Sequence, residues 1–187
     1  IRPAHAMGDG IYKSEDAGKT WKNMGLEKTG RIGRIIVHPT NPDIVYAASL
    51  GHTYGPQQER GVYKTMDGGK TWKRIFFVDE NTGAAELALD PKNPDRLLVG
   101  MWSIHINTWG LRSGGEGGGV YRSLDGGETW EKILYVSDKA GAVDVPKNSL
   151  EDILDALEET NDTKVIQLVQ DRKTPWYSIA ASAASGI

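Results

Sequence analysis

A short motif occurs three times in this chain, at residues 10–21, 61–72 and 119–130. Each copy runs Gly, an apolar residue, Tyr, a basic residue, Ser or Thr, any residue, Asp, any residue, Gly, any residue, Thr and Trp. A repeated unit indicates an architecture built from similar supersecondary elements stacked side by side. This repetition constrains the fold more than any other feature of the sequence.

The motif itself predicts a β-hairpin. Apolar and polar residues alternate before the Asp, as in a strand, and the Thr-Trp pair begins the partner strand. In the turn between them, the Asp accepts backbone N–H groups and the Gly supplies a positive φ. The Ser or Thr hydroxyl adds a second local bond, and the Trp covers the turn. We therefore expect a structural role for Ser14, Asp16, Gly18, Trp21, Thr65, Asp67, Gly69, Trp72, Ser123, Asp125, Gly127 and Trp130.

Two more strand segments precede the second and third hairpins. Segments 30–37 and 44–49 flank a turn rich in Pro and Asn, and segments 84–89 and 96–102 repeat that order. Units of four strands, about 50 to 60 residues long, are typical of β-propeller blades. The first hairpin lacks the two preceding strands, so the chain offers one half blade and two full blades.

The Ser/Thr-x-Asp-x-Gly-x-Thr-Trp pattern in triplicate resembles the Asp box of the β-propeller families that include sialidases, sortilin and xyloglucanases. This resemblance covers about residues 8–135 and implies an all-β fold, a partial β-propeller of four-stranded blades, as a domain at 1–135. A closed propeller needs about four to eight blades. We therefore expect further blades outside this chain, assembly of several chains, or self-association through open blade edges.

After residue 135 the blade pattern stops. Segment 149–159 predicts a helix, because its apolar residues follow helical spacing after a capping box, and segment 163–169 predicts a buried strand. We expect residues 136–187 to form a short C-terminal α/β segment. It is similar to a helix-strand unit of nucleoside-diphosphate-forming acyl-CoA synthetases; a fusion, an insertion or an artificial junction are the alternatives.

The net charge and the absence of cysteine argue against several classes of function. The 187 residues carry a net charge of −3, which gives no basic footprint for nucleic acid, and there is no cysteine for disulfides or thiolate ligands. The four histidines lack metal-like spacing, and the Gly-rich run 114–119 lacks the Lys-Ser/Thr of a phosphate loop. We expect no metal, no cofactor, no membrane span and no signal peptide within this chain. The resemblance implies an extracellular or periplasmic location.

The candidate binding face lies opposite the Asp boxes. In the families that this chain resembles, Asp boxes are not catalytic and lie away from the ligand site. The opposite face is built by the loops 50–60, 79–83 and 103–118, whose aromatic rings beside amides and carboxylates suit a glycan or a peptide. The ligand-binding candidates are His52, Tyr54, Arg60, His105, Trp109 and Arg112.

The same loops contain weaker catalytic candidates, namely Glu59, Asp79, Glu80 and Glu116. Glycoside hydrolysis needs two carboxyl groups about 5 to 10 Å apart. The alternative is structural: Glu59 pairs with Arg60, and Asp79 caps a turn. A sialidase would need several arginines around a substrate carboxylate, and Arg60 with Arg112 does not make that set.

The resulting hypothesis is a binding or scaffold module that presents loops 50–60 and 103–118 to a glycan, protein or peptide. One alternative is part of a glycoside hydrolase of the Asp-box kind, with some of the active site on other blades. Another is an engineered or chimeric chain without its own activity.

Overall fold

The structure is a computed structural model that describes residues 7–52, 54–107, 109–143 and 145. Within these residues the regular elements are strands, plus one short 3-10 turn, η1 (Glu27–Thr29). The all-β fold class is therefore confirmed for this part of the chain. The predicted helix at 149–159 and strand at 163–169 lie outside the described residues.

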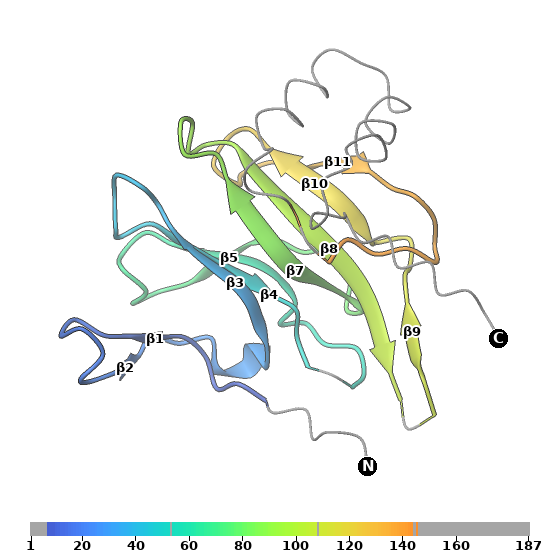
Figure 1. The fold of residues 1–187 in the computed structure, drawn as a ribbon, viewed down its shortest axis with the longest axis horizontal. Coiled ribbons are helices and arrows are strands. Elements are labelled where there is room, and N and C mark those ends of the chain that lie inside the picture. Colours follow the sequence, from blue (N-terminus) through green and yellow to red (C-terminus); the bar gives the residue numbers. More distant parts are fainter. Residues whose placement is uncertain (1–6, 53, 108, 144, 146–187) are drawn as a thin grey trace, which may run out of the picture.

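The first and second copies of the motif belong to separate sheets (Figure 1). The first hairpin gives the two-stranded pair β1 (Tyr12–Lys13) and β2 (Lys22–Asn23). The next sheet has the consecutive order β3-β4-β5-β6 and is antiparallel throughout. Its strands are β3 (Ile32–Val37), β4 (Val45–Ser49), β5 (Gly61–Thr65) and β6 (Lys73–Phe76).

The third sheet repeats this arrangement with one addition. Its main path is β7-β8-β10-β11, and β9 pairs with the far end of β8. The strands are β7 (Thr82–Leu89), β8 (Leu97–Ile106), β9 (Leu111–Ser113), β10 (Gly119–Ser123) and β11 (Glu131–Leu134). The sequence predicted a loop at 103–118, but β8 continues through residues 103–106 to form a hairpin with β9. The alternating Ile104 and Ile106, both buried, explain this extension.

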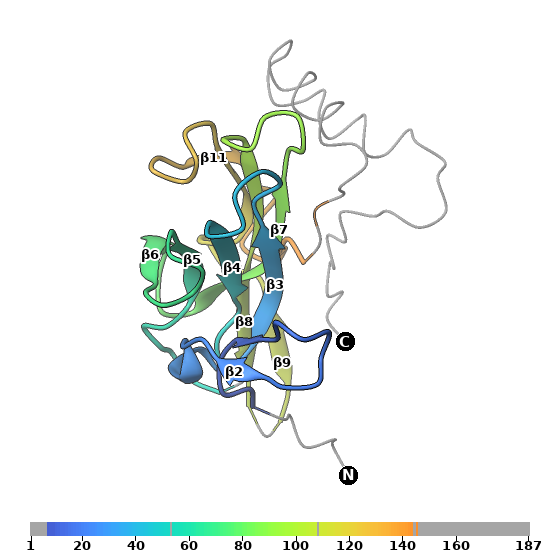
Figure 2. The same ribbon diagram turned by 90° about the vertical axis from the view of Figure 1, so that its left-hand side faces the viewer.

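The two large sheets pack face to face, with first strands β3 and β7 side by side (Figures 1 and 2). The approach is close at Gly33, where an added Cβ would lie 2.2 Å from the carbonyl oxygen of Ala85. The main core fills the space between the sheets, with Tyr46 and Val62 from one sheet against Leu97 from the other. Burial of each such side chain contributes about 1.5 to 3 kcal/mol.

Each full sheet carries its Asp box between the third and fourth strands. The box also contacts the turn between the first and second strands, because Gly68 N–H donates to Asp43 O at 2.9 Å and Gly126 N–H donates to Asp95 O at 2.8 Å. These turns and the boxes lie at one end of the strands. The loops 50–60, 79–81 and 114–118 follow the opposite ends.

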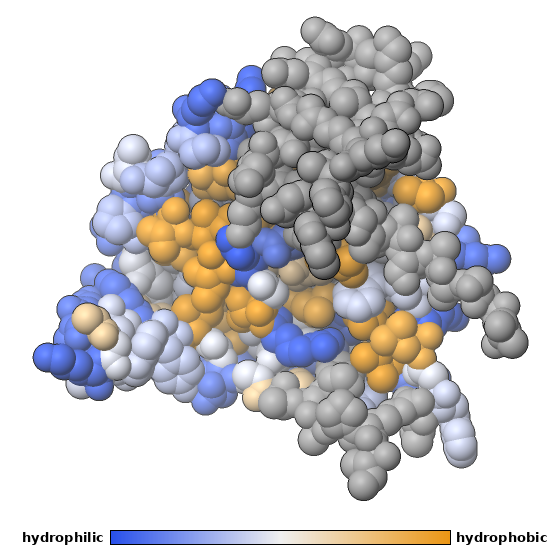
Figure 3. Space-filling model, in the orientation of Figure 1, coloured by the Kyte–Doolittle hydropathy of each residue, from blue (hydrophilic) through white to orange (hydrophobic). Residues whose placement is uncertain are grey.

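A second, smaller core covers the outer face of the third sheet. Leu98 and Val120 from this sheet pack against Ala142 and Val145, which follow the last strand. On the second sheet, by contrast, Ile35 and Val37 of β3 are 43% and 54% exposed. Figure 3 shows an apolar area over β3 and β7.

Candidate functional site

The Asp-box carboxylates are occupied by their own turns. Asp67 accepts the Thr71 N–H at 2.9 Å and the hydroxyls of Thr71 and Thr65 at 2.6 and 2.7 Å. The Thr71 hydroxyl, the Thr71 N–H and the Thr65 hydroxyl hold the pKa of Asp67 well below its usual range. The equivalent bonds, with the Thr20 N–H first, lower the pKa of Asp16 to about 2. Because these oxygens are already hydrogen-bonded, the boxes offer no free acid or base.

The box tryptophans reach different partners. Trp130 donates its indole N–H to the Gly127 carbonyl of its own turn at 3.1 Å and stacks on Phe76 of the preceding sheet, with ring centroids 4.9 Å apart. Trp72 donates instead to Met24 O, beside the preceding hairpin, at 2.7 Å. Trp21 is 62% exposed. The second and third tryptophans thus join neighbouring units, a role that the sequence pattern alone did not reveal.

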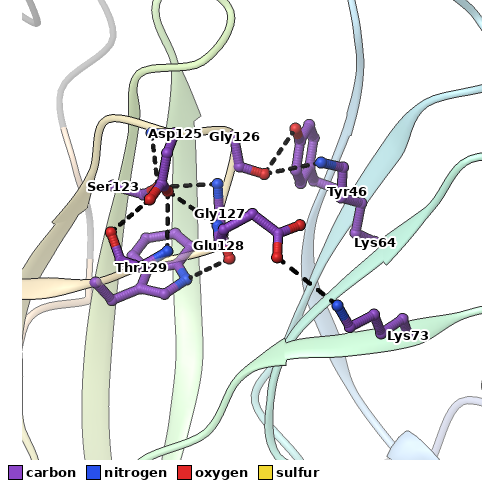
Figure 4. Close-up of polar contacts among 10 residues, drawn as sticks. Tyr46, Lys64, Lys73, Ser123, Asp125, Gly126, Gly127, Glu128 and Thr129 are labelled. Atoms are coloured by element: carbon purple, nitrogen blue, oxygen red, sulfur yellow. Dashed lines mark hydrogen bonds and ion pairs between the residues drawn. The ribbon is translucent and has the colours of Figure 1, made fainter.

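The third Asp box also forms a polar clasp to the second sheet (Figure 4). The Gly126 carbonyl accepts the Tyr46 hydroxyl at 3.2 Å and the Lys64 ammonium at 2.9 Å. An ion pair between Lys73 and Glu128, at 3.8 Å, lies nearby. The box therefore acts as a contact between blades as well as a turn.

The candidate loops at the opposite end are joined to each other. Gln57 N–H donates to Glu80 O at 2.9 Å, and the Gln58 amide donates to the Glu80 carboxylate. Loop 114–118 adjoins them, since a Cβ on Gly117 would lie 2.5 Å from Asp79 Oδ2. The three segments form one surface.

The predicted ligand-binding residues differ in how far their side chains are exposed. Tyr54 and Trp109 are 61% and 91% exposed, and His105 lies opposite Arg112 in the β8–β9 pair. The ring Nε2 of His52 lies 3.0 Å from Lys28 O. Tyr54, Trp109 and Arg112 are thus open to a ligand, whereas His52 is partly engaged.

Arg60 requires a correction, because its side chain is only 1% exposed. The guanidinium donates to Asn81 O at 3.1 Å and to the carbonyls of His52 and Gly55, both at 3.3 Å. Arg60 therefore holds loops 50–60 and 79–81 together from beneath. It does not present its side chain on the surface, and it forms no ion pair with Glu59 in the described part of the chain.

The four acidic candidates are arranged more as loop supports than as a catalytic pair. Asp79 accepts Asn81 N–H at 2.7 Å and the Thr82 hydroxyl at 2.9 Å, so it caps its own turn. Glu59 accepts the Gln57 amide at 3.4 Å, Glu80 accepts Gln58, and Glu116 is exposed. Within the described residues, no group of three or more His, Cys, Asp or Glu side chains could hold a metal ion. A search of those same residues for a helix long and apolar enough to cross a membrane also found none.

Repeated Asp-box hairpins on stacked four-stranded sheets define the class: this is a β-propeller protein of the Asp-box type. The family model described as "Sortilin, neurotensin receptor 3" (Sortilin-Vps10) matches residues 9–175, and the chain belongs to this family. The resemblance predicted from the motif is thereby confirmed.

Known proteins extend this assignment. A xyloglucanase, Xgh74A of Acetivibrio thermocellus, is 28% identical over 155 residues, which cover 79% of this chain and 16% of the enzyme. The photosystem II assembly lipoprotein Ycf48 of Trichormus variabilis is 26% identical over 148 residues, covering 70% of this chain and 44% of that protein. The crystal structure of an ancestral GH74 enzyme matches with a TM-score of 0.55 at 22% identity, over 70% of this chain and 16% of the enzyme, and supports the propeller fold. The chain thus spans less than half the length of each of these relatives.

Proposed function

We propose that the loop face of this chain binds a glycan, and that Trp109 is its main contact. This indole is 91% exposed at the end of the β8–β9 hairpin. An indole buries a large apolar area when a sugar ring stacks on it, and its N–H remains available to a hydroxyl. An exposed Trp held at a projecting turn is the observation that carries the proposal.

The turn that carries Trp109 is held in place by its own hydrogen bonds. Asn107 Oδ1 accepts the N–H groups of Trp109 and Gly110 at 3.0 and 2.8 Å. At the base of the hairpin, Trp102 donates its indole N–H to Ser113 Oγ at 2.7 Å. A turn that is ordered before binding loses less conformational entropy when a ligand arrives.

Exposed groups on loop 50–60 and on β9 supply the rest of the surface. Tyr54 offers a second ring, and Arg112 adds hydrogen-bond donors suited to sugar hydroxyls. The similarity to a protein named as a xyloglucanase favours a β-glucan as the glycan class. We also propose that the protein works outside the cytoplasm, in the extracellular space or the periplasm, as the family resemblance implies.

Hydrolysis of the bound glycan is the second candidate function, and a protein or peptide is the alternative ligand. The xyloglucanase relative favours hydrolysis. The hydrogen bonds that engage Asp79 in its own turn favour binding without turnover.

Isothermal titration with xyloglucan oligosaccharides tests the proposal. We expect Trp109→Ala to weaken binding at least tenfold. Trp21→Ala is the matched control, because Trp21 is also an exposed indole but belongs to an Asp box. Unchanged affinity in Trp109→Ala, or an equal loss in both variants, would refute the proposal. Release of reducing sugar that Asp79→Asn abolishes would replace it with the hydrolase reading.

A further inference from the structure

Two arginines beneath the loop face have buried N–H groups without a partner. The Arg60 side chain is 1% exposed, and its Nε has no hydrogen-bond partner. The Nη2 of Arg31, at the start of the second sheet, is also buried without a partner. A buried guanidinium nitrogen that loses water without a replacement acceptor destabilises the folded state. Such atoms call for an acceptor that the described residues do not supply.

The acceptors that these two side chains do have are neutral. Arg31 Nε donates to the Gly51 carbonyl at 3.1 Å, and among the described residues Arg60 donates to the carbonyls of Asn81, His52 and Gly55. No carboxylate in the described part of the chain forms an ion pair with either guanidinium. Two positive charges are therefore held near one loop without a counter-charge in contact.

The two guanidinium groups are close enough to influence each other. Burial lowers the pKa of Arg60, the charge of Arg31 lowers that pKa further, and the nearby Asp79 carboxylate raises it by a smaller amount. Burial also lowers the pKa of Arg31. A bound anion beside Arg31 would relieve both effects, because its negative charge offsets the two positive charges.

Arg31 also borders open space. It lines a pocket of about 440 Å³ together with Thr29, Gly30 and Leu50. Gly51, which accepts the Arg31 bond, is next to Leu50, and a Cβ on it would lie 3.1 Å from Arg60 Nε. The pocket thus brings a small ligand beside Arg31, whereas Arg60 lies behind Gly51 and does not line the pocket.

We propose that Arg31, supported by Arg60, forms an oxyanion-binding site in this pocket. The planar guanidinium fork matches the paired oxygens of a carboxylate, sulfate or phosphate group. The anion is either a free inorganic ion or an acidic group on a glycan, such as a uronate. The second source rests on the proposed glycan function, whereas the first is independent of it.

Isothermal titration at constant ionic strength, with chloride as the background anion, tests the site. Sodium sulfate probes the free ion, glucuronate probes the acidic sugar, and glucose is the neutral match for glucuronate. We expect sulfate or glucuronate, but not glucose, to bind, and Arg31→Gln to weaken that binding at least tenfold. Arg31→Lys should fall between, since it keeps the charge but loses the fork. Tighter binding of glucuronate than of sulfate would identify the acidic sugar as the source.

Arg34→Gln is the matched control, because Arg34 lies on β3 three residues after Arg31, and its Nε, which is also buried without a hydrogen bond, has an ion pair with Glu86 at 3.4 Å. It should bind both anions as the unmodified chain does. The proposal fails if neither anion binds, or if Arg31→Gln binds as tightly as Arg34→Gln. Loss of xyloglucan binding in Trp109→Ala is read separately, so failure of the glycan proposal and failure of the anion site are distinguishable.

Discussion

Hydrogen bonds within the Asp-box turns lower the pKa of each Asp-box carboxylate, so the stability of the fold depends on pH. Asp16 has its pKa lowered to about 2, and those of Asp67 and Asp125 fall further, through Thr N–H groups and Ser or Thr hydroxyls. An unfolded Asp titrates near a pKa of about 3.9. The folded state therefore binds fewer protons than the unfolded state in the acid range.

This difference predicts an acid-sensitive stability. The contribution is fully present above about pH 5 and is lost progressively as the pH falls through the unfolded and then the folded pKa. We expect the free energy of unfolding, measured by urea titration, to fall between about pH 5 and pH 2. Asp67→Asn should reduce that fall, whereas Asp138→Asn, an exposed control, should leave it unchanged. Equal pH slopes in both variants would contradict the assignment.

Gly61 sets the geometry at the start of the third strand of its blade. Its φ is +114°, and an added Cβ would lie 2.1 Å from the Phe76 carbonyl oxygen on the fourth strand. Gly10 and Gly119, at the equivalent positions of the other units, make the same approach at 2.4 and 2.3 Å. The repeated glycine that opens each motif is therefore required by the close strand pairing.

Substitution tests this requirement. Gly61→Ala should lower the free energy of unfolding by about 1 to 3 kcal/mol through backbone strain and collision with the carbonyl. Gly110→Ala should change it by less than about 0.5 kcal/mol, because no atom lies within 4 Å of the added methyl group. Chemical denaturation of the two variants gives the comparison, and similar values would show that the close approach is tolerated.

Neighbouring blades are joined by hydrogen bonds and ring stacking between residues of different sheets. The Gly126 carbonyl accepts both Tyr46 and Lys64 from the preceding sheet, and Tyr46 is only 2% exposed. Trp130 stacks on Phe76 at the same interface. The polar clasp fixes the Asp box above the apolar core that Tyr46 helps to form.

Removal of one clasp bond should have a modest cost. Tyr46→Phe should lower the free energy of unfolding by about 0.5 to 1.5 kcal/mol, because Lys64 still satisfies the carbonyl. Adding Lys64→Met should cost more than the sum of the single changes, since the carbonyl then loses both donors. Tyr12→Phe, at an exposed hydroxyl bonded to Asp9, is the control and should have little effect. Strict additivity in urea titrations would argue against a shared acceptor.

The two outer faces of the blade stack differ in how far their apolar side chains are covered. The third sheet is covered by Ala142 and Val145, whereas Ile35 and Val37 on the second sheet remain 43% and 54% exposed. An exposed apolar sheet face favours association. Self-association through this face is the expected consequence.

Analytical ultracentrifugation tests this expectation. The chain should form concentration-dependent oligomers, and Val37→Lys should weaken their association at least tenfold. Leu124→Lys is the control, because Leu124 is 50% exposed but lies on the Asp-box hairpin. A monomer at all concentrations, or an equal response of both variants, would show that the β3 face does not mediate contact.

The Asp-box hairpins, the repeat of four strands and hence the family could be predicted from the amino-acid sequence. These depend on local chemistry: a turn Asp, a Gly with positive φ and alternating apolar residues act within one short segment. The sequence analysis predicted a loop at 103–118 and so missed the end of β8. The partner strand β9 is short, and residues typical of turns separate it from β8.

Which loop residues face solvent and which support the fold depends on how the blades pack, and the sequence did not reveal it. Arg60 and Arg112 are the same residue type on candidate loops, yet Arg60 is buried under backbone carbonyls from two loops and Arg112 is exposed. Trp21 and Trp72 hold the same motif position, yet Trp72 donates to Met24 of the neighbouring unit while Trp21 is 62% exposed. The burial of a side chain and its hydrogen-bond partners depend on segments that are distant in sequence. The three copies of the motif therefore acquire different surroundings only when the blades are stacked.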